Sequence, residues 1–322
     1  MRIAVLVALA SAALAALAPP GVMAQPAWQP SKPVRIVVPY PPGGTADALP
    51  RLIGDKVANS LGQPVIFENR GGASANIGSE YVARAEPDGH TLLVVAPHVV
   101  TTNAVLYKLN YDPNAFAPVS IIASYPNVLV ANPKRAATLQ ELIAYAKANP
   151  GKLFYGSQGN STSSHLSGEM LKMMAGINMV HVPYKGSAPA LVDLLAGQVD
   201  IMFDNLLATM QYIKAGKLRL LGVGSAKRQS SVPDAPAIAE VVPGFLSETW
   251  MGIVAPPKTP PAITGRISAA VAEAVKSPDI VKRLNDLNTD PVGNTPAQMA
   301  EVIKQDTERW VGVVRAANVK AD

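Results

Sequence analysis

The chain has 322 residues, of which 48% are apolar, 16% charged and 5% aromatic, and it contains no cysteine. This composition excludes a collagen, a disordered chain and a disulfide-stapled mini-protein, and the lack of cysteine excludes thiolate metal sites, thiol nucleophiles and redox pairs. The formal net charge of +5 is small and dispersed along the sequence, which argues against a nucleic-acid surface and is compatible with attraction of small anions.

The first residues have the pattern of a secretory signal. Arg2 precedes an apolar run over 3–18, which ends in a Pro-Pro-Gly breaker and small residues up to Ala24. The run is shorter than the roughly 20 residues that a membrane span needs, so we interpret 1–24 as a signal peptide rather than an anchor. The sequence therefore predicts a soluble chain that is exported.

Strand and helix signals alternate after residue 32. β-branched or apolar runs end in Gly-rich turns, and helical spacing resumes after each turn, first at Leu49 and then at Ile77. Strands are predicted at 34–38, 65–68 and 91–95. Strands that alternate with helices indicate a largely parallel sheet with helices on both faces.

A second set of signals begins near Tyr125. Thr138 and Glu141 form a capping box that opens a helix, and Ser187 is a candidate N-cap of a helix over 188–196 that stops at Gly197. Strands are predicted at 128–130, 152–155, 180–182 and 200–203, and long helices at 262–276, 278–287 and 296–317.

This order predicts an α/β chain in which one half is interrupted by the other. Residues 25–124 and 245–322 are expected to form one lobe and residues 125–244 a second. Two crossings, near 123–125 and 243–250, would join the lobes, and such lobes hinge. Ligands of open α/β sheets bind beyond the carboxyl ends of strands, so the Gly-rich loops of both lobes are expected to face one cleft.

The turn over 41–47 is the first candidate binding feature. Gly43 and Gly44 let backbone N–H groups approach an anion, and the helix that follows adds the positive end of its dipole. The alternative is a capped turn, in which Thr45 or Asp47 satisfies the unpaired N–H groups of the helix itself. The turn alone leaves both interpretations open, and the turn over 71–78 has the same ambiguity.

The stretch over 157–165 holds five hydroxyl side chains and His165, directly before an apolar helix. These groups are neutral donors at a helix N-terminus, which suits reversible binding. A hydrolase would need Gly-x-Ser-x-Gly here, and residues 156–159 have a different spacing. For His165 we expect a capping or packing role rather than that of a base.

The sequence contains no metal-binding or nucleotide-binding motif. The four histidines are dispersed and never occur at i, i+4 or in a His-Glu-x-x-His pattern. The Gly-Val-Gly segment at 222–224 lacks the third glycine of a dinucleotide fingerprint. A Gly-Lys-Ser/Thr motif of the P-loop type does not occur in the sequence. We therefore expect no metal and no cofactor.

Asp204 is the most suggestive single carboxylate, because it ends a hydrophobic strand. It is expected to orient an amino group of a ligand or to hold ordered waters that in turn bind a carboxylate. The alternative is a helix N-cap on the segment that begins at Asn205.

Taken together, the motifs resemble those of a known family. The segments 34–47, 68–70, 87–89, 155–165 and 181–186, continuing to Asp204, resemble the Bug-type substrate-binding proteins of tripartite tricarboxylate transporters. The resemblance covers the mature chain, and its most specific part is 181–186 with 197–200.

The resemblance implies a fold like that of the type II periplasmic binding proteins, with two lobes, each a mainly parallel sheet flanked by helices. It also implies a monomeric, non-enzymatic solute receptor that closes on a small organic carboxylate and presents it to a membrane permease. Family members hold the ligand through backbone groups and bridging waters. Carried over, the site residues are Tyr40, Gly43, Gly44, Thr45, Ala73, Ser74, Ser157, Thr162, His165, Tyr184, Lys185, Gly186, Ser187 and Asp204.

Several positions depart from the family pattern and leave the ligand open. They are Gly71 where proline is usual, Ser74 where glycine is usual, Ser161 where glycine is frequent, Pro50 where alanine is usual, and the segment 96–98 in place of a more polar loop. Two alternatives stay open: an exported hydrolase or lyase using His165 and a nearby serine, and a sensory module that passes its ligand-bound state to a partner protein.

Overall fold

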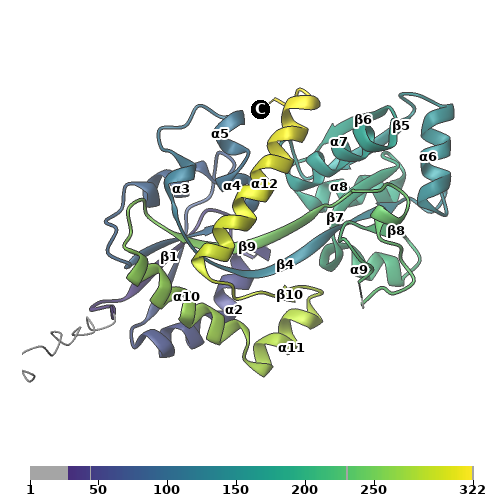
Figure 1. Ribbon diagram of the computed structural model, residues 1–322. Coiled ribbons are helices and arrows are strands. Elements are labelled where there is room, and N and C mark those ends of the chain that lie inside the picture. The colour runs from purple at the N-terminus through teal and green to yellow at the C-terminus, as the bar shows by residue number, and fades with distance from the viewer. Residues whose placement is uncertain (1–27, 44, 230, 321–322) are drawn as a thin grey trace, which may run out of the picture.

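A computed structural model describes residues 28–43, 45–229 and 231–320. The predicted signal segment, 1–24, lies outside these residues. The described chain forms two lobes, and the chain crosses between them twice, along two long strands that run side by side through the middle of Figure 1.

The first lobe contains the first half of the described chain and its last helices. Its strands are β1 (Val34–Val38), β2 (Val65–Asn69), β3 (Thr91–Val95), the first part of β4 (Ala117–Ala131), β9 (Glu248–Ala255) and β10 (Asp290–Pro291). Its helices are α2 (Thr45–Leu61), α3 (Asn76–Ala83), α4 (Pro97–Val100), α5 (Asn103–Leu106), the 3-10 turn η2 (Pro113–Ala115), α10 (Pro261–Val275), α11 (Pro278–Asp286) and α12 (Pro296–Ala316). The strand order is β2-β1-β3-β9-β4-β10, parallel among the first three strands and antiparallel from β3 to β10.

The second lobe is formed by the residues between the two crossings. Its strands are the end of β4, β5 (Leu153–Ser157), β6 (Met179–Pro183), β7 (Ile201–Asn205) and β8 (Arg219–Val223). Its helices are α6 (Leu139–Ala148), α7 (Ser163–Ala175), α8 (Ser187–Ala196), α9 (Leu206–Lys214) and the 3-10 turn η3 (Ile238–Glu240). The strand order is β8-β4-β7-β5-β6, with β5 parallel to β6 and β7, and β4 antiparallel to β7 and β8.

Each lobe buries both faces of its sheet. In β1, Val34, Ile36 and Val38 pack with α2 and α10 on one face, whereas Val37 packs with Val82 of α3 on the other. Burial on both faces explains why this strand is a continuous apolar run rather than an alternating one. In the second lobe, α6 and α7 cover one face and α8 and α9 the other.

The two crossings meet at one backbone junction. Asn127 N–H donates to Ser247 O (2.9 Å), Ser247 N–H donates to Gly224 O (2.8 Å), and Gly224 N–H donates to Asn127 O (2.7 Å). Asn127 Nδ2 also donates to Ser247 Oγ (2.9 Å). Because β4 pairs with β9 up to Pro126 and with β7 and β8 from Asn127 on, this junction is the point at which one lobe gives way to the other.

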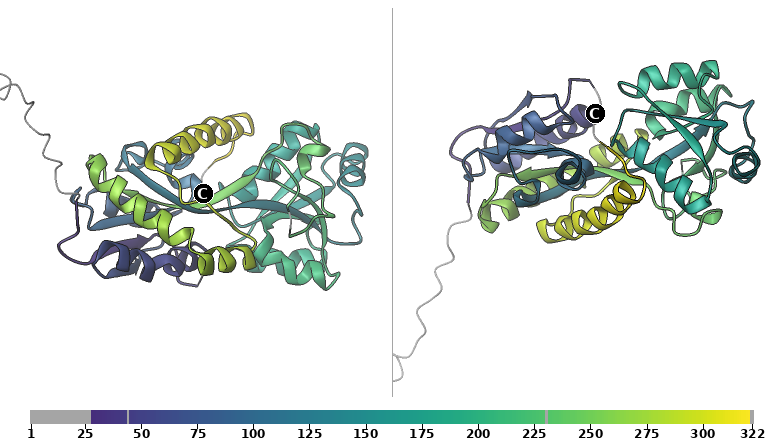
Figure 2. Two further views of the ribbon diagram at one scale, coloured as in Figure 1. Left: turned by 60° about the horizontal axis from the view of Figure 1, so that its bottom comes forward. Right: turned by 90° about the horizontal axis from the view of Figure 1, so that it is seen from above.

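Helix α12 contacts both lobes. Near its start Met299 packs in the first lobe, and further along Trp310 and Val314 pack in the core of the second. The sequence placed 245–322 in the first lobe, whereas this helix lies over both, as Figure 2 shows. None of the helices formed by the described residues has the length and apolarity that a membrane crossing demands.

The structure confirms most predicted elements and corrects three points. β4 begins at Ala117, well before the predicted strand at 128–130, and the strands β8, β9 and β10 were not foreseen. Ser187 is not the N-cap of α8: Gly186 holds that position, and the Ser187 hydroxyl donates instead to Asp204. Gly197 does end the helix, in the left-handed conformation (φ 78°) that a C-terminal glycine favours.

Candidate functional site

A cavity of about 470 Å³ lies between the lobes, within the range of small-molecule sites. The first lobe lines it with Pro39, Tyr40, Pro41, Gly72, Ser74, Ala75, His98 and Asn103, and the second with Gln158, Asn160, Ser161, Thr162, Ser163 and Gly186. Tyr40, Ser74, Thr162 and Gly186 were predicted as site residues from the sequence. The structure therefore brings together residues of both lobes, from turns that are far apart in the chain.

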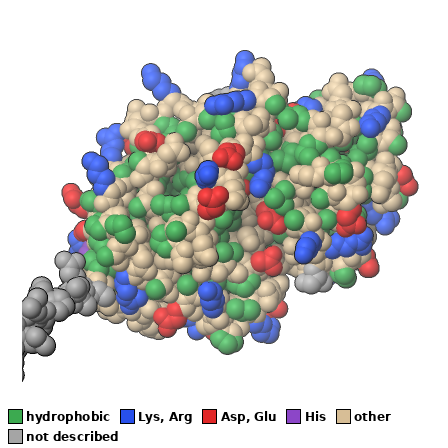
Figure 3. Space-filling view, in the orientation of Figure 1, with side chains coloured by type: hydrophobic (Ala, Val, Ile, Leu, Met, Phe, Trp, Pro, Cys, Tyr) green, Lys and Arg blue, Asp and Glu red, His purple; other side chains and the backbone are tan. Residues whose placement is uncertain are grey.

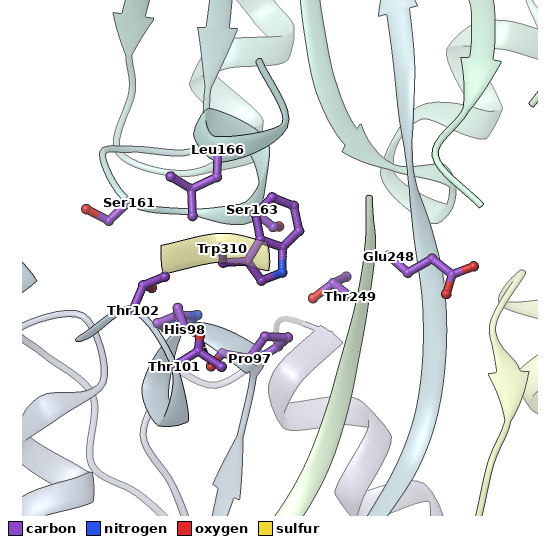
Figure 4. Close-up of a pocket in the computed structure, with 10 residues that line it drawn as sticks. All are labelled: Pro97, His98, Thr101, Thr102, Ser161, Ser163, Leu166, Glu248, Thr249 and Trp310. Carbon is purple, nitrogen blue, oxygen red and sulfur yellow. Dashed lines mark hydrogen bonds between the residues drawn. The ribbon is translucent and has the colours of Figure 1, made fainter. Parts of the chain in front are cut away.

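A smaller chamber adjoins this cavity and shares His98, Ser161 and Ser163 with it. Figure 4 shows Leu166 and Ser161 of the second lobe facing Pro97, His98, Thr101 and Thr102 of the first, with Trp310 of α12 between them. The Glu248 carboxylate points away from the other residues. The chamber has about 30 Å³ of room, enough for one or two waters.

His98 stands where the cavity and the chamber meet, and its ring is edge-on to that of Tyr40, with 6.2 Å between the ring centres. Burial lowers the pKa of His98 to about 4, so the imidazole is neutral at physiological pH. Among the described residues that line the cavity and the chamber, none is a lysine or an arginine. The lining thus consists of neutral groups apart from Glu248.

Three helix N-termini meet at the cavity. Ala75 caps α3, Thr162 caps α7 and Gly186 caps α8, and all three residues line the cavity. The helix α3 belongs to the first lobe and the other two to the second. A helix N-terminus carries about half a positive charge and unpaired backbone N–H groups. The convergence of three such ends gives the cavity a positive potential without a cationic side chain.

Two turns of the lining contain strained backbone. Ala73, Ser74 and Ala75 are consecutive residues in the left-handed region (φ 46°, 51° and 71°), and Ser161 has φ 66°. This conformation costs a residue with a side chain roughly 1–2 kcal/mol relative to the right-handed one. Such strain clusters where a structure holds groups for binding. It also explains physically why glycine suits the positions of Ser74 and Ser161.

Asp204 is fully buried and holds one of the lining residues in place. Its carboxylate accepts hydrogen bonds from Gln158 Nε2 (2.5 Å), from Asn205 N–H (2.7 Å) and from the Ser187 hydroxyl. Gln158 lines the cavity, whereas Asp204 does not. The N-cap of α9 is Asn205, whose side chain accepts from Ala208 N–H. Asp204 therefore fastens β7 to the loop after β5 and to the start of α8.

The ionisation of Asp204 predicts a pH dependence of stability. Burial raises the pKa of Asp204 to about 6 from its ordinary 3.8, so the folded protein holds this proton more tightly than the unfolded chain. The stabilisation is complete below pH 3.8 and is lost as the pH rises through about 6. A shift of this size is worth roughly 3 kcal/mol. In urea unfolding at pH 4 to 7, Asp204→Asn should lack this slope, and parallel curves for the two proteins would contradict the assignment.

The hydroxyl-rich segment before α7 is held by two stacked histidines. The rings of His165 and His181 are parallel with centres 3.8 Å apart. His165 Nδ1 accepts from Ser161 N–H (3.1 Å), and the Ser157 hydroxyl is 2.7 Å from His181 Nε2. Ser157 and His165 thus lie behind the lining, and His165 fixes the backbone of a residue that lines the cavity.

This arrangement does not match the hydrolase alternative. The serine beside a histidine nitrogen is Ser157, which is completely buried, and its partner is His181 rather than His165. Burial lowers the pKa of His181 to about 3, with a further contribution from His165, which makes it a poor base at neutral pH. Neither Ser157 nor His181 lines the cavity.

The turn before α2 has a structural role. Gly43 N–H donates to Asp47 Oδ2 (3.0 Å), and Asp47 also accepts from Arg51 Nε (2.8 Å) and Asn69 Nδ2 (2.9 Å). Neither Gly43 nor Thr45 lines the cavity, and Gly44 lies outside the described residues. Asp47 thus ties Gly43, which precedes the helix, to the first turn of α2, and the role of this turn in binding stays a prediction.

The other predicted residues lie around the cavity rather than in its lining. Tyr184 packs against Gly156 and donates to Asp193 Oδ2 (2.7 Å). Lys185 is exposed, and Ala73 is exposed beside the lining residue Gly72. Ser187 is bound to Asp204. These residues shape the loops that carry Gly186 and Ser74 to the cavity.

Several lining residues were not named as site residues from the sequence: Asn103 was missed, and His98, Gln158 and Ser163 entered only within the segments 96–98 and 157–165. His98 and Asn103 belong to two short helices, α4 and α5, that periodicity cannot detect in four residues each. The one available signal was a serine in a glycine-rich turn at Ser161. Among the described residues, no group of three His, Asp or Glu side chains could hold a metal ion.

Comparison with known proteins gives a consistent result. Residues 49–319 match the model of the family described as the tripartite tricarboxylate transporter family receptor. The chain is 36% identical over 299 residues to protein BugT of Bordetella pertussis, covering 90% of this chain and 91% of that protein.

Solved structures agree with this match. A structure of R. palustris Rpa4515 with adipate is 37% identical, with a TM-score of 0.80, covering 90% of this chain and 99% of that one. MatC of Rhodopseudomonas palustris, with bound malate, is 32% identical, with a TM-score of 0.76 and coverages of 88% and 99%. The predicted fold class and the predicted family resemblance are confirmed.

Proposed function

The chain belongs to the tripartite tricarboxylate transporter receptor family, and on this premise we propose that it binds a small organic carboxylate in the cavity between its lobes. The observation that carries this proposal is the convergence of the N-termini of α3, α7 and α8 on one cavity. An anion at that point accepts hydrogen bonds from backbone N–H groups and lies at the positive ends of the helix dipoles.

The lining favours reversible binding over chemistry. Its hydroxyl, amide and backbone groups are neutral hydrogen-bond partners, and a neutral His98 adds no charge. Bound ligands of two relatives, adipate and malate, are organic acids. The site that we propose consists of Tyr40, Ser74, Ser161, Thr162, Ser163 and Gly186, held from behind by residues such as His165 and Asp204.

We further propose that the lobes close on the ligand by rotation about the junction of Asn127, Gly224 and Ser247, with residues up to about 126 and from about 247 in one lobe. The mature protein would act as a monomer in the periplasm and deliver the acid to a membrane permease.

On the face shown in Figure 3, lysine and arginine side chains are interspersed with aspartate and glutamate. This mixture suits a soluble carrier better than a nucleic-acid surface.

Titration calorimetry with a panel of mono-, di- and tricarboxylates tests the proposal. We expect saturable binding of at least one acid with one site per chain, and binding at least tenfold weaker for the primary amide of that acid, because hydrogen bonds to a charged acceptor are about twice as strong. Native mass spectrometry of the purified protein would identify an acid that co-purifies.

Two outcomes would count against this function. Absence of saturable binding for every acid in the panel would contradict the proposal that the ligand is a carboxylate. Equal affinity for an acid and its amide would contradict the proposal that the helix N-termini bind its negative charge. Small-angle scattering with and without a saturating acid tests the closure separately, since an unchanged radius of gyration would leave binding intact but exclude the rotation.

A further inference from the structure

Four buried polar atoms beside the cavity and its chamber have no hydrogen-bond partner: Tyr40 Oη, Thr102 Oγ1, Asn103 Oδ1 and Ser161 Oγ. Thr102 and Asn103 are completely buried, and Ser161 is 4% exposed. Asn103 and Ser161 line the cavity, and Thr102 and Ser161 line the chamber that adjoins it. Buried polar atoms are nearly always paired in folded proteins, so four unpaired ones around one space point to a group of the ligand.

The orientation of Asn103 decides what that group must supply. Asn103 Nδ2 donates to Ser74 O (3.0 Å) and to Asn76 Oδ1 (2.9 Å). Because a backbone carbonyl only accepts, the amide cannot be turned round, and the unpaired atom is the acceptor Oδ1. It needs a donor from the ligand, and an ionised carboxylate has none.

The other three atoms are hydroxyl oxygens, which both donate and accept. Figure 4 shows Thr102 and Ser161 at the same end of the chamber, on opposite sides of it and away from Glu248. An alcohol suits this set, because it donates to Asn103 and accepts from either hydroxyl. An ammonium group only donates and would be buried without a counter-charge, because the Glu248 carboxylate points away from the chamber.

We infer that the ligand is a hydroxy acid, whose alcohol donates to Asn103 Oδ1 and accepts from Thr102 or Ser161 while its carboxylate lies at the helix N-termini. This inference rests on the proposed function and names the class of acid. The relatives leave the class open, because adipate carries no hydroxyl group and malate carries one. Ser161 supplies its hydroxyl from a left-handed position that glycine would occupy without strain.

Matched pairs of acids test the inference by calorimetry: malate with succinate, lactate with propionate, and 3-hydroxybutyrate with butyrate. In the pair that fits the cavity, we expect the hydroxylated member to bind at least tenfold more tightly. Thr102→Val keeps the shape of the side chain and removes its hydroxyl, and Thr102 makes no cap bond that would be lost. In this variant the preference should fall below about threefold.

Ser161→Gly and Ser161→Ala form a second, internally controlled pair. Both remove the hydroxyl, but only glycine relieves the left-handed backbone, so both should lose the preference while Ser161→Gly alone raises the thermal midpoint. Equal binding of the hydroxy and deoxy acids by the wild type would overturn the inference and leave carboxylate binding standing. Tighter binding of an amino analogue, aspartate against malate, would overturn the choice of an alcohol. Failure of every acid to bind would instead remove the proposed function itself.

Discussion

Gly224→Ala should lower the free energy of unfolding by about 3 kcal/mol, at the upper end of the usual cost of overpacking. A Cβ at Gly224 would lie 2.5 Å from Ser247 O and 2.7 Å from Asn127 O. Both are backbone atoms of the two crossings, and both take part in the ring of three hydrogen bonds that joins them. No side chain can move aside to make room, so the crossings themselves would have to separate.

Urea unfolding of the wild type and the variant measures this effect, with Gly312→Ala as the matched control. Gly312 lies in the middle of α12 and has no atom within 4 Å of an added Cβ. Alanine there should stabilise the protein by up to about 1 kcal/mol, from helix propensity alone. If Gly224→Ala unfolded at the same urea concentration as the wild type, the junction would be looser than the structure indicates.

Asp204→Ala should weaken the binding of the acid by between 10- and 100-fold, or about 1.4–2.8 kcal/mol. The variant removes the acceptor that holds Gln158 in the lining and the acceptor that holds Ser187 at the start of α8. A buried donor that loses its partner costs about 1–3 kcal/mol. The loss should exceed that of any single hydroxyl in the lining, because two segments of the cavity are released together.

Isothermal titration with the acid identified from the panel gives the comparison, and circular dichroism checks that the variant is folded. Asp193→Ala is the control, because Asp193 accepts from Tyr184 and neither residue lines the cavity. Its affinity should stay within about threefold of the wild type. Equal losses for the two variants would mean that the effect comes from α8 as a whole and not from the contact with Gln158.

The alternation of strands and helices could be predicted because it is a local property. A β-branched run followed by glycines and then by helical spacing specifies β1 and α2 whatever surrounds them. The strand β9 could not be predicted in this way, because Glu248–Ala255 is a short, almost wholly buried apolar run that periodicity cannot assign to helix or strand. Its place between β3 and β4 depends on pairing with distant strands.

The residues of the candidate site likewise fall into those that local sequence predicts and those that depend on distant contacts. Turns at the ends of strands could be predicted, and Tyr40, Ser74, Thr162 and Gly186 come from such turns. The sequence could not predict which side chain of a turn faces the cavity, because the orientation depends on hydrogen bonds to residues elsewhere in the fold. Ser157 and Asp204 look like ligand groups in the sequence, yet His181 and Gln158 are their partners in the structure.

The position of β9 also limits the order in which the molecule assembles. In the first sheet β9 lies between β3 and β4. The sheet therefore cannot be completed without Glu248–Ala255, which lie far along the chain from β1, β2 and β3. The second sheet consists of β4 to β8, which are consecutive in the chain, and its contacts are more local and quicker to form. We therefore expect the second lobe to fold first and the first sheet to be completed when β9 inserts between β3 and β4.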